Sequence, residues 1–165
     1  MTTLNRELRR VLEKVSTGAR EAAEEAAEKA LRALAVGERK AHDSMTDKKQ
    51  TALRKRLRAH GRQLGDKRNV EKDTQTIDHL MSECAYEHWH RMLFARFLAE
   101  NGLLVEPNSG AAISIEEIQQ LARSRAHDWV ALAGEFAVCM LPQVFRQDDP
   151  VLEVRFAPED RKRLE

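Results

Sequence analysis

Glycine and proline are scarce in this chain, and their scarcity argues against a fold built from strands and tight turns. Only 7 glycines and 4 prolines occur among 165 residues, whereas β-sandwiches and barrels need frequent turn signals. Aromatic residues are few, at 5%, while charged residues make up 33% of the chain, above the usual value of about 25%. Such a composition is typical of solvent-exposed helices. It predicts an all-α fold, a helical bundle of about five helices with a long N-terminal helical hairpin.

Motifs that hold cofactors or activate nucleophiles are missing as well. The two cysteines, Cys84 and Cys139, form no C-x-x-C pair, so neither a zinc site nor a redox site is predicted. The sequence contains no G-x-S-x-G elbow, no G-x-G-x-x-G loop and no Walker lysine motif. His79, His88 and His90 would point to different sides of one helix, since each residue advances the helix by ~100°. The chain is therefore predicted to carry no catalytic residue, no metal and no cofactor.

Long apolar runs are also absent from the sequence. No stretch approaches the ~18 apolar residues of a membrane span. The first 14 residues mix both charge signs and lack the apolar segment of a signal peptide. Both cysteines lie within apolar helical patterns, and buried free thiols fit a reducing compartment. These features predict a cytoplasmic protein without a membrane segment.

Apolar residues recur with the period of an α-helix through most of the chain. The expected helices cover 4–36, 45–64, a stretch capped by Asp73 or Thr74 that runs to Asn101, 114–123, and 129–145. Pro142 is expected to kink or end the last of these near Met140. A short extended piece over 151–156 and a helix starting at Pro158 complete the chain. We expect residues 1–73 to form a charged arm, with its two helices projecting as an antiparallel pair. Residues 74–165 are expected to form a compact helical core, and the whole to be one structural unit of a longer protein.

Charge is distributed unevenly along the chain. From Lys48 to Arg68 there are nine basic residues and one acidic residue, a net charge of +8. From Thr74 to Glu165 there are nine basic and fifteen acidic residues, a net charge of −6. The net charge of the whole protein is only +1. A local basic block of this kind influences which partners approach the surface.

Five cations of the second expected helix are predicted to share its outer face, away from the stripe that contains Leu53, Leu57 and Leu64. They are Lys48, Arg54, Lys55, Arg58 and Arg62. Cations on one rigid face neutralise DNA phosphates without reading the base sequence. No aromatic residues are interleaved with them, so stacking on single-stranded bases is not supported. The predicted partner is the backbone of double-stranded DNA. The alternative is a solvated face that meets only acidic residues of the protein, such as Asp148 and Asp149.

Three stretches of the second half resemble a known family. They are AYEHWHRMLFARFLAENGLL from Ala85 to Leu104, IEEIQQLA from Ile115 to Ala122, and MLPQVFRQDDP from Met140 to Pro150. They are similar to the N-terminal helical region of large bacterial adenine-specific DNA methyltransferases. These enzymes include the methylase subunits of type IIG restriction-modification systems and the related phage-exclusion (BREX, PglX-like) methyltransferases. The resemblance runs from Thr76 to Leu164 and is looser over the first 75 residues. The family-motif residues are Tyr86, Trp89, His90, Arg91, Phe94, Arg96, Phe97, Glu100 and Asn101.

This resemblance implies a parent enzyme that uses S-adenosylmethionine to methylate adenine N6 in a defined DNA sequence. Its cofactor loop and its Asn-Pro-Pro-Tyr-type motif would lie downstream of Glu165, because no two prolines of this chain are adjacent. The chain would then be a non-catalytic module that helps bind the DNA backbone or docks the downstream methyltransferase domain or other subunits of the system. The alternative is a helical protein-interaction or homo-oligomerisation module that uses the Ala-rich part of the first helix and has no direct DNA contact.

Overall fold

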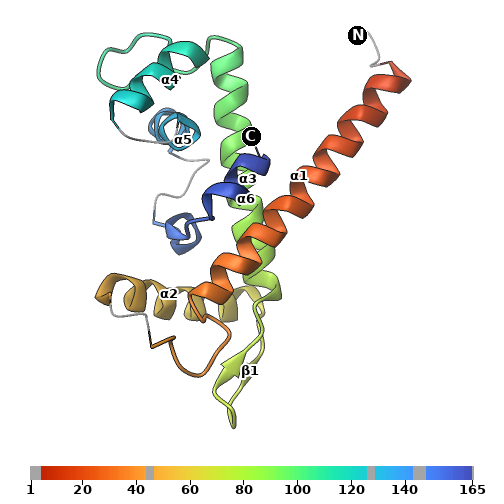
Figure 1. The fold of residues 1–165 in the computed structure, drawn as a ribbon, viewed down its shortest axis with the longest axis vertical. Coiled ribbons are helices and arrows are strands. Elements are labelled where there is room, and N and C mark those ends of the chain that lie inside the picture. Colours follow the sequence, from red (N-terminus) through yellow and green to blue (C-terminus); the bar gives the residue numbers. More distant parts are fainter. Residues whose placement is uncertain (1–4, 44–46, 126–128, 143–147, 165) are drawn as a thin grey trace. The chain divides into compact units, whose positions relative to one another are not determined.

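Helices form nearly all the regular structure in the computed structural model, which describes residues 5–43, 47–125, 129–142 and 148–164. The α-helices are α1 (Arg6–Ala33), α2 (Lys48–Leu64), α3 (Asp78–Glu100), α4 (Ile115–Ser124), α5 (Trp129–Met140) and α6 (Pro158–Leu164) (Figure 1). A 3-10 helix, η1 (Pro150–Glu153), precedes α6, and two short strands, β1 (Arg68–Asn69) and β2 (Thr74–Gln75), form a hairpin. The protein is therefore all-α, as the composition predicted. None of the helices in the described residues has the length and apolarity needed to cross a bilayer.

Contacts divide the chain into two compact units. Unit 1 comprises Met1–Glu87 and Pro150–Glu165, and unit 2 comprises His88–Asp149. Helix α3 contributes residues to both. This division differs from the boundary expected at residue 73, because the C-terminal elements η1 and α6 return to pack against α2 and α1.

The second half of α1 is held in unit 1 by α6. Small buried side chains line this part of α1, with Leu31 at its end, and they allow close helix approach: Ala22, Ala23, Ala26 and Ala27. Lys29 adds an ion pair of 2.7 Å with Asp160 of α6. Helix α2 packs instead against η1, where Arg56 pairs with Glu153 at 2.6 Å. The two helices expected as a projecting pair thus each pack on a C-terminal element, and the Ala-rich half of α1 is not an open surface.

Helix α1 ends in a Schellman motif that has alanine where glycine is usual. The amide of Val36 donates to Leu31 O at 3.1 Å, and the amide of Ala35 donates to Arg32 O at 2.8 Å. Ala35 has a φ of 51°, in the left-handed region that costs a non-glycine residue ~1 kcal/mol or more. Both Ala35 and Val36 are fully buried. Burial and side-chain hydrogen bonds to this turn compensate for the unfavourable backbone conformation.

A short hairpin between α2 and α3 was not predicted from the sequence. Arg68 pairs with Gln75, and Asn69 pairs with Thr74, in antiparallel register. Asp73 and Thr74, the expected N-caps of the third helix, therefore lie in this hairpin, and α3 begins only at Asp78. The hairpin also brings Asp73 and Gln75 to the cationic side chains of α2.

Unit 2 has its own hydrophobic core. Helix α4 packs against α5, and their buried residues Ile118, Leu132 and Phe136 join Leu104 from the segment after α3. Helix α5 ends at Met140, which confirms the expected effect of Pro142. Gly134 of α5 lies against the side chain of Arg91, where an added Cβ would be 2.9 Å from Arg91 Nε. A larger residue at position 134 would therefore force the Arg91 side chain to shift.

The capping box at the start of α4 gives unit 2 an acid-sensitive contact. Ser114 Oγ accepts from Glu117 N at 3.2 Å, and Glu117 Oε2 accepts from Ser114 N at 2.8 Å. The hydrogen bond from the Ser114 amide to the carboxylate, and then the Ser114 side chain, hold the pKa of Glu117 below its usual value of 4.5. The folded state thus favours the carboxylate, so its contribution to stability is present above pH 4.5 and is lost as the pH falls through the lower folded pKa.

Glu117→Gln is accordingly expected to destabilise α4 at neutral pH and to have progressively less effect below pH 4.5. Hydrogen exchange of the α4 amides, compared between the parent chain and the variant across this range, measures the difference. Glu116→Gln, a change at an exposed neighbour in the same turn, is the matched control: it leaves the capping box intact and should change the exchange of the α4 amides less than Glu117→Gln does at neutral pH. A Glu117→Gln effect that persists unchanged in acid would contradict the assigned role of the carboxylate.

Candidate nucleic-acid interface

Helix α2 carries the five cations that were predicted to contact DNA phosphates, and local signals set its ends. The Asp47 side chain caps its N-terminus by accepting from Lys49 N at 2.9 Å. Gly65, with a φ of 116°, ends the helix in the left-handed conformation. The 17 residues between these caps form one uninterrupted helix. The cations therefore occupy fixed positions relative to one another.

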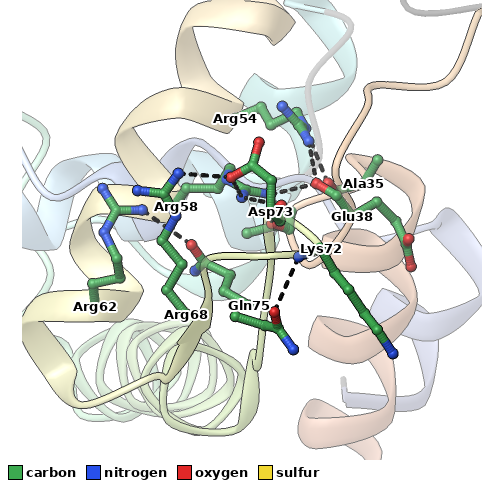
Figure 2. Close-up of polar contacts among 11 residues, drawn as sticks. Ala35, Glu38, Arg54, Arg58, Arg62, Arg68, Lys72, Asp73 and Gln75 are labelled. Carbon is green, nitrogen blue, oxygen red and sulfur yellow. Dashed lines mark hydrogen bonds and ion pairs between the residues drawn. The ribbon is translucent and has the colours of Figure 1, made fainter.

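Arg54 points into unit 1 and is only 9% exposed. Its Nε donates to Ala35 O at 2.9 Å, and its terminal NH2 donates to Glu38 O at 2.6 Å (Figure 2). Both acceptors belong to the turn that follows α1. Arg54 thus supplies donors to the carbonyl groups of a strained turn, and its guanidinium group is not available to a phosphate.

Arg58 lies one turn further along α2 and is 8% exposed. It donates to Val36 O at 3.0 Å, to Glu38 O, and to Asp73 O at 2.9 Å (Figure 2). The Asp73 carboxylate is 3.5 Å away. Burial, and then the nearby charge of Arg54, lowers the pKa of Arg58. This residue joins three segments of unit 1: α2, the turn after α1, and the hairpin.

The prediction that Arg54 and Arg58 stand on the outer face of α2 is therefore wrong. In a helical projection the centre of the apolar stripe is about 80° from Arg54 and about 120° from Arg58. The buried face of α2 is wide enough to include both, since it is formed by Leu53, Leu57, Gly61 and these two arginines. Hydrogen bonds to four main-chain carbonyl groups make the burial of two like charges possible.

The other three cations remain on the outer face of α2. Lys48, Lys55 and Arg62 are all exposed and recur every seven residues. Seven residues turn a helix by about 700°, close to two full turns, and advance it by about 10 Å. The three side chains thus form one row along the outer face, with successive cations about 10 Å apart. We call these residues the outer row.

Contacts within unit 1 leave the outer row largely unneutralised. Arg62 donates to Gln75 Oε1 at 3.1 Å, a neutral acceptor (Figure 2). Among the residues that the structure describes, no carboxylate forms an ion pair with a cation of the outer row. Among the described residues, the alternative interpretation of a basic face that meets acidic residues of the protein is supported at Arg58, whose guanidinium group is 3.5 Å from the Asp73 carboxylate, but not at the outer row.

The hairpin adds cationic side chains that the predicted site did not include. Lys67 and Lys72 are exposed, as is Arg68. Arg68 donates to Asp73 Oδ1 at 2.8 Å, and this hydrogen bond is the main reason that the pKa of Asp73 is lowered. The density of positive charge between residues 48 and 68 was visible in the sequence. The chain reversal at 68–75 had no such sequence signal.

The family-motif residues lie along α3 and its end, with several partners internal to the helix. Arg96 Nε donates to Glu100 Oε1 at 2.8 Å, a pairing of residues four apart on one side of the helix. Asn101 Nδ2 donates to Phe97 O at 2.8 Å and so closes the last turn of α3. Four further motif residues are half-buried: Trp89, His90, Arg91 and Phe94. Tyr86 and Phe97 are 52% and 53% exposed, so much of their ring surface is open to solvent.

Comparison with known proteins identifies no relative. No family model, no curated protein and no solved structure matches this chain. The charges and contacts described above are therefore the physical basis for a functional proposal.

Proposed function

We propose that this chain is the non-catalytic N-terminal helical module of a large bacterial adenine-specific DNA methyltransferase, of the restriction-modification or BREX phage-defence kind. The module acts in the cytoplasm and holds the backbone of double-stranded DNA while chemistry and base reading occur elsewhere in the parent protein. S-adenosylmethionine would bind elsewhere in the parent protein, because this chain contains no motif that binds it. The resemblance of residues 76–164 supports the family, and the outer row of α2 supports the DNA contact.

The single observation that carries the DNA proposal is the outer row itself. Lys48, Lys55 and Arg62 are exposed on one rigid helix face. Charges on such a face attract the phosphate backbone without requiring a base contact, and release of condensed counterions supplies the free energy. Binding of this type is independent of DNA sequence and weakens steeply as salt is added.

Neutralising the outer row is expected to weaken duplex binding equally for all sequences. In the triple variant Lys48→Gln/Lys55→Gln/Arg62→Gln, loss of three phosphate contacts should reduce the slope of log K against log salt by about 2.7 in magnitude. The measurement is fluorescence anisotropy with two unrelated DNA duplexes over a series of salt concentrations. Circular dichroism verifies that α2 is retained.

A second triple variant controls for the change in net charge. Arg20→Gln/Arg123→Gln/Arg125→Gln also removes three exposed cations but leaves α2 untouched. It should change the salt dependence much less than the outer-row variant does. Equal effects of the two triple variants, or no measurable duplex binding by the parent chain at low salt, would refute the proposed interface.

The alternative function is a helical interaction module with no DNA contact. One observation favours it, namely the large apolar side chains that α1 leaves exposed: Leu8, Val11, Leu12 and Val15. Apolar groups gathered on one surface commonly mark a protein-protein contact. The two functions differ in the anisotropy experiment, because an interaction module binds no duplex at any salt concentration.

A further inference from the structure

The first half of α1 carries an apolar face that nothing in the described part of unit 1 covers. Leu8, Val11, Leu12 and Val15 are 48%, 52%, 48% and 62% exposed, respectively. Their spacings of three, one and three residues place them on one side of the helix. We call these four residues the open stripe. Figure 1 shows this half of α1, in red, extending away from α2 and from the hairpin of the same unit.

The open stripe contrasts with the rest of the same helix. From Ala22 onward, the inward side of α1 is buried against α6, whereas every residue from Arg6 to Gly18 is exposed. A helical segment of about 13 residues without tertiary contacts is marginal in water. Large aliphatic side chains at i, i+3 and i+7 are an unusual choice for a solvated helix, and they are the pattern by which one helix recognises another.

Charged residues beside the open stripe indicate which helix it recognises. In the heptad that has Leu8 and Val15 at its a positions and Val11 at d, Glu7 and Lys14 both occupy g positions. They lie on the same edge of the stripe, carry opposite charge, and are both exposed. Among the described residues neither forms an ion pair. The edge is thus acidic at one end of the stripe and basic at the other.

We infer that the open stripe is a self-association surface, on which a second copy of this chain packs with its α1 antiparallel. A two-fold axis near the middle of the stripe places Glu7 of each copy beside Lys14 of the other and so forms two equivalent ion pairs. A parallel arrangement would pair each g position with an e position, where Leu12 and Ala19 offer no charge. Only the antiparallel arrangement satisfies the apolar face and the charged edge together.

The size of the open stripe sets the strength of this association. Four aliphatic side chains on each copy bury less than the roughly 1,200 Å² that stable interfaces require. The isolated chain should therefore be a monomer at low concentration and form dimers with a dissociation constant above about 10 μM. Pairing of α1 involves neither the outer row nor any other part of α2, so this inference does not depend on DNA binding.

The test is a charge exchange across the open stripe, read by sedimentation equilibrium of the full chain over a hundredfold concentration range. Glu7→Lys and Lys14→Glu each convert both intermolecular ion pairs into like-charge pairs, and each should raise the dissociation constant by about fivefold or more. The double variant Glu7→Lys/Lys14→Glu restores opposite charges and should return the constant to within about twofold of the parent value.

Two further variants test the apolar part of the surface. Leu8→Asn/Val11→Asn removes apolar surface from the open stripe and should leave the chain monomeric at every concentration. The fold should be retained, because neither residue belongs to the core. Val70→Asn is the matched control, because Val70 is 78% exposed on the hairpin, and it should leave dimerisation unchanged. A parent chain that remains monomeric throughout, single variants without effect, or a double variant as weak as the single ones would each overturn the inference. Because the double variant keeps the net charge and none of these variants alters the outer row, these outcomes are distinguishable from a failure of the DNA proposal.

Discussion

Replacing Arg58 with methionine is expected to lower the free energy of unfolding of unit 1 by about 2–4 kcal/mol. Methionine fills much of the space of the arginine stem but donates no hydrogen bond. The carbonyl oxygens of Val36 and Asp73, now bonded to Arg58 at 3.0 and 2.9 Å, would lose this donor in a buried environment. Urea unfolding followed by circular dichroism measures the loss, and hydrogen exchange in α2 assigns it to unit 1.

Two variants of the same helix make this prediction specific. Arg62→Met is the matched control, because Arg62 is exposed and, among the described residues, its one hydrogen bond is to Gln75 Oε1, so it should cost about 1 kcal/mol or less. Arg58→Lys keeps the charge, but a single ammonium group cannot reach the acceptors on both the turn after α1 and the hairpin, and it should recover less than half of the loss. If Arg58→Met cost no more than Arg62→Met, Arg58 would not be the link between these segments.

The two buried arginines also explain where sequence reasoning about the site failed. The existence of α2 and its stop at Gly65 follow from local signals, and both are observed. The inward position of Arg54 and Arg58 depends on carbonyl groups that the turn after α1 presents. That turn exists because Ala35 adopts a left-handed conformation, which a sequence signals with glycine or asparagine and not with alanine. The charge pattern alone therefore could not distinguish the two buried arginines from the three exposed cations of the outer row.

Other elements were predictable to the extent that short-range chemistry determines them. The helix expected over 114–123 and the end of α5 before Pro142 are both present. The hairpin was not expected, because strands of two residues show no alternation of apolar and polar side chains. The return of residues 150–165 to unit 1 is a long-range contact between surfaces that no spacing rule connects. Local rules thus predicted most helices but not how they are grouped.

The start of α3 is a further case in which a distant residue takes the place of a local cap. Asp66 follows the C-cap of α2 and is 4% exposed. Its Oδ1 accepts from His79 N at 3.0 Å, and its Oδ2 accepts from Leu80 N at 3.2 Å. These amides belong to the first turn of α3, whose donors have no partner within the helix. A carboxylate at this end also interacts favourably with the helix dipole. Gly61 permits the approach, since an added Cβ there would lie 2.7 Å from Asp66 Oδ2.

Asp66→Ala is therefore expected to destabilise unit 1 by about 2–3 kcal/mol, because the buried amide of Leu80 and the partly buried amide of His79 lose their acceptor and the helix loses its anionic cap. Asp66→Asn should recover only part of this, since the amide group keeps one acceptor oxygen and turns a donor toward the other N–H. Asp78→Asn, an exposed carboxylate in the same first turn, is the control and should cost less than about 1 kcal/mol. The decisive measurement is hydrogen exchange at the amides of His79 and Leu80, which should accelerate in Asp66→Ala well before global unfolding. Unchanged protection of these two amides would mean that α3 is capped by other groups and that Asp66 is replaceable.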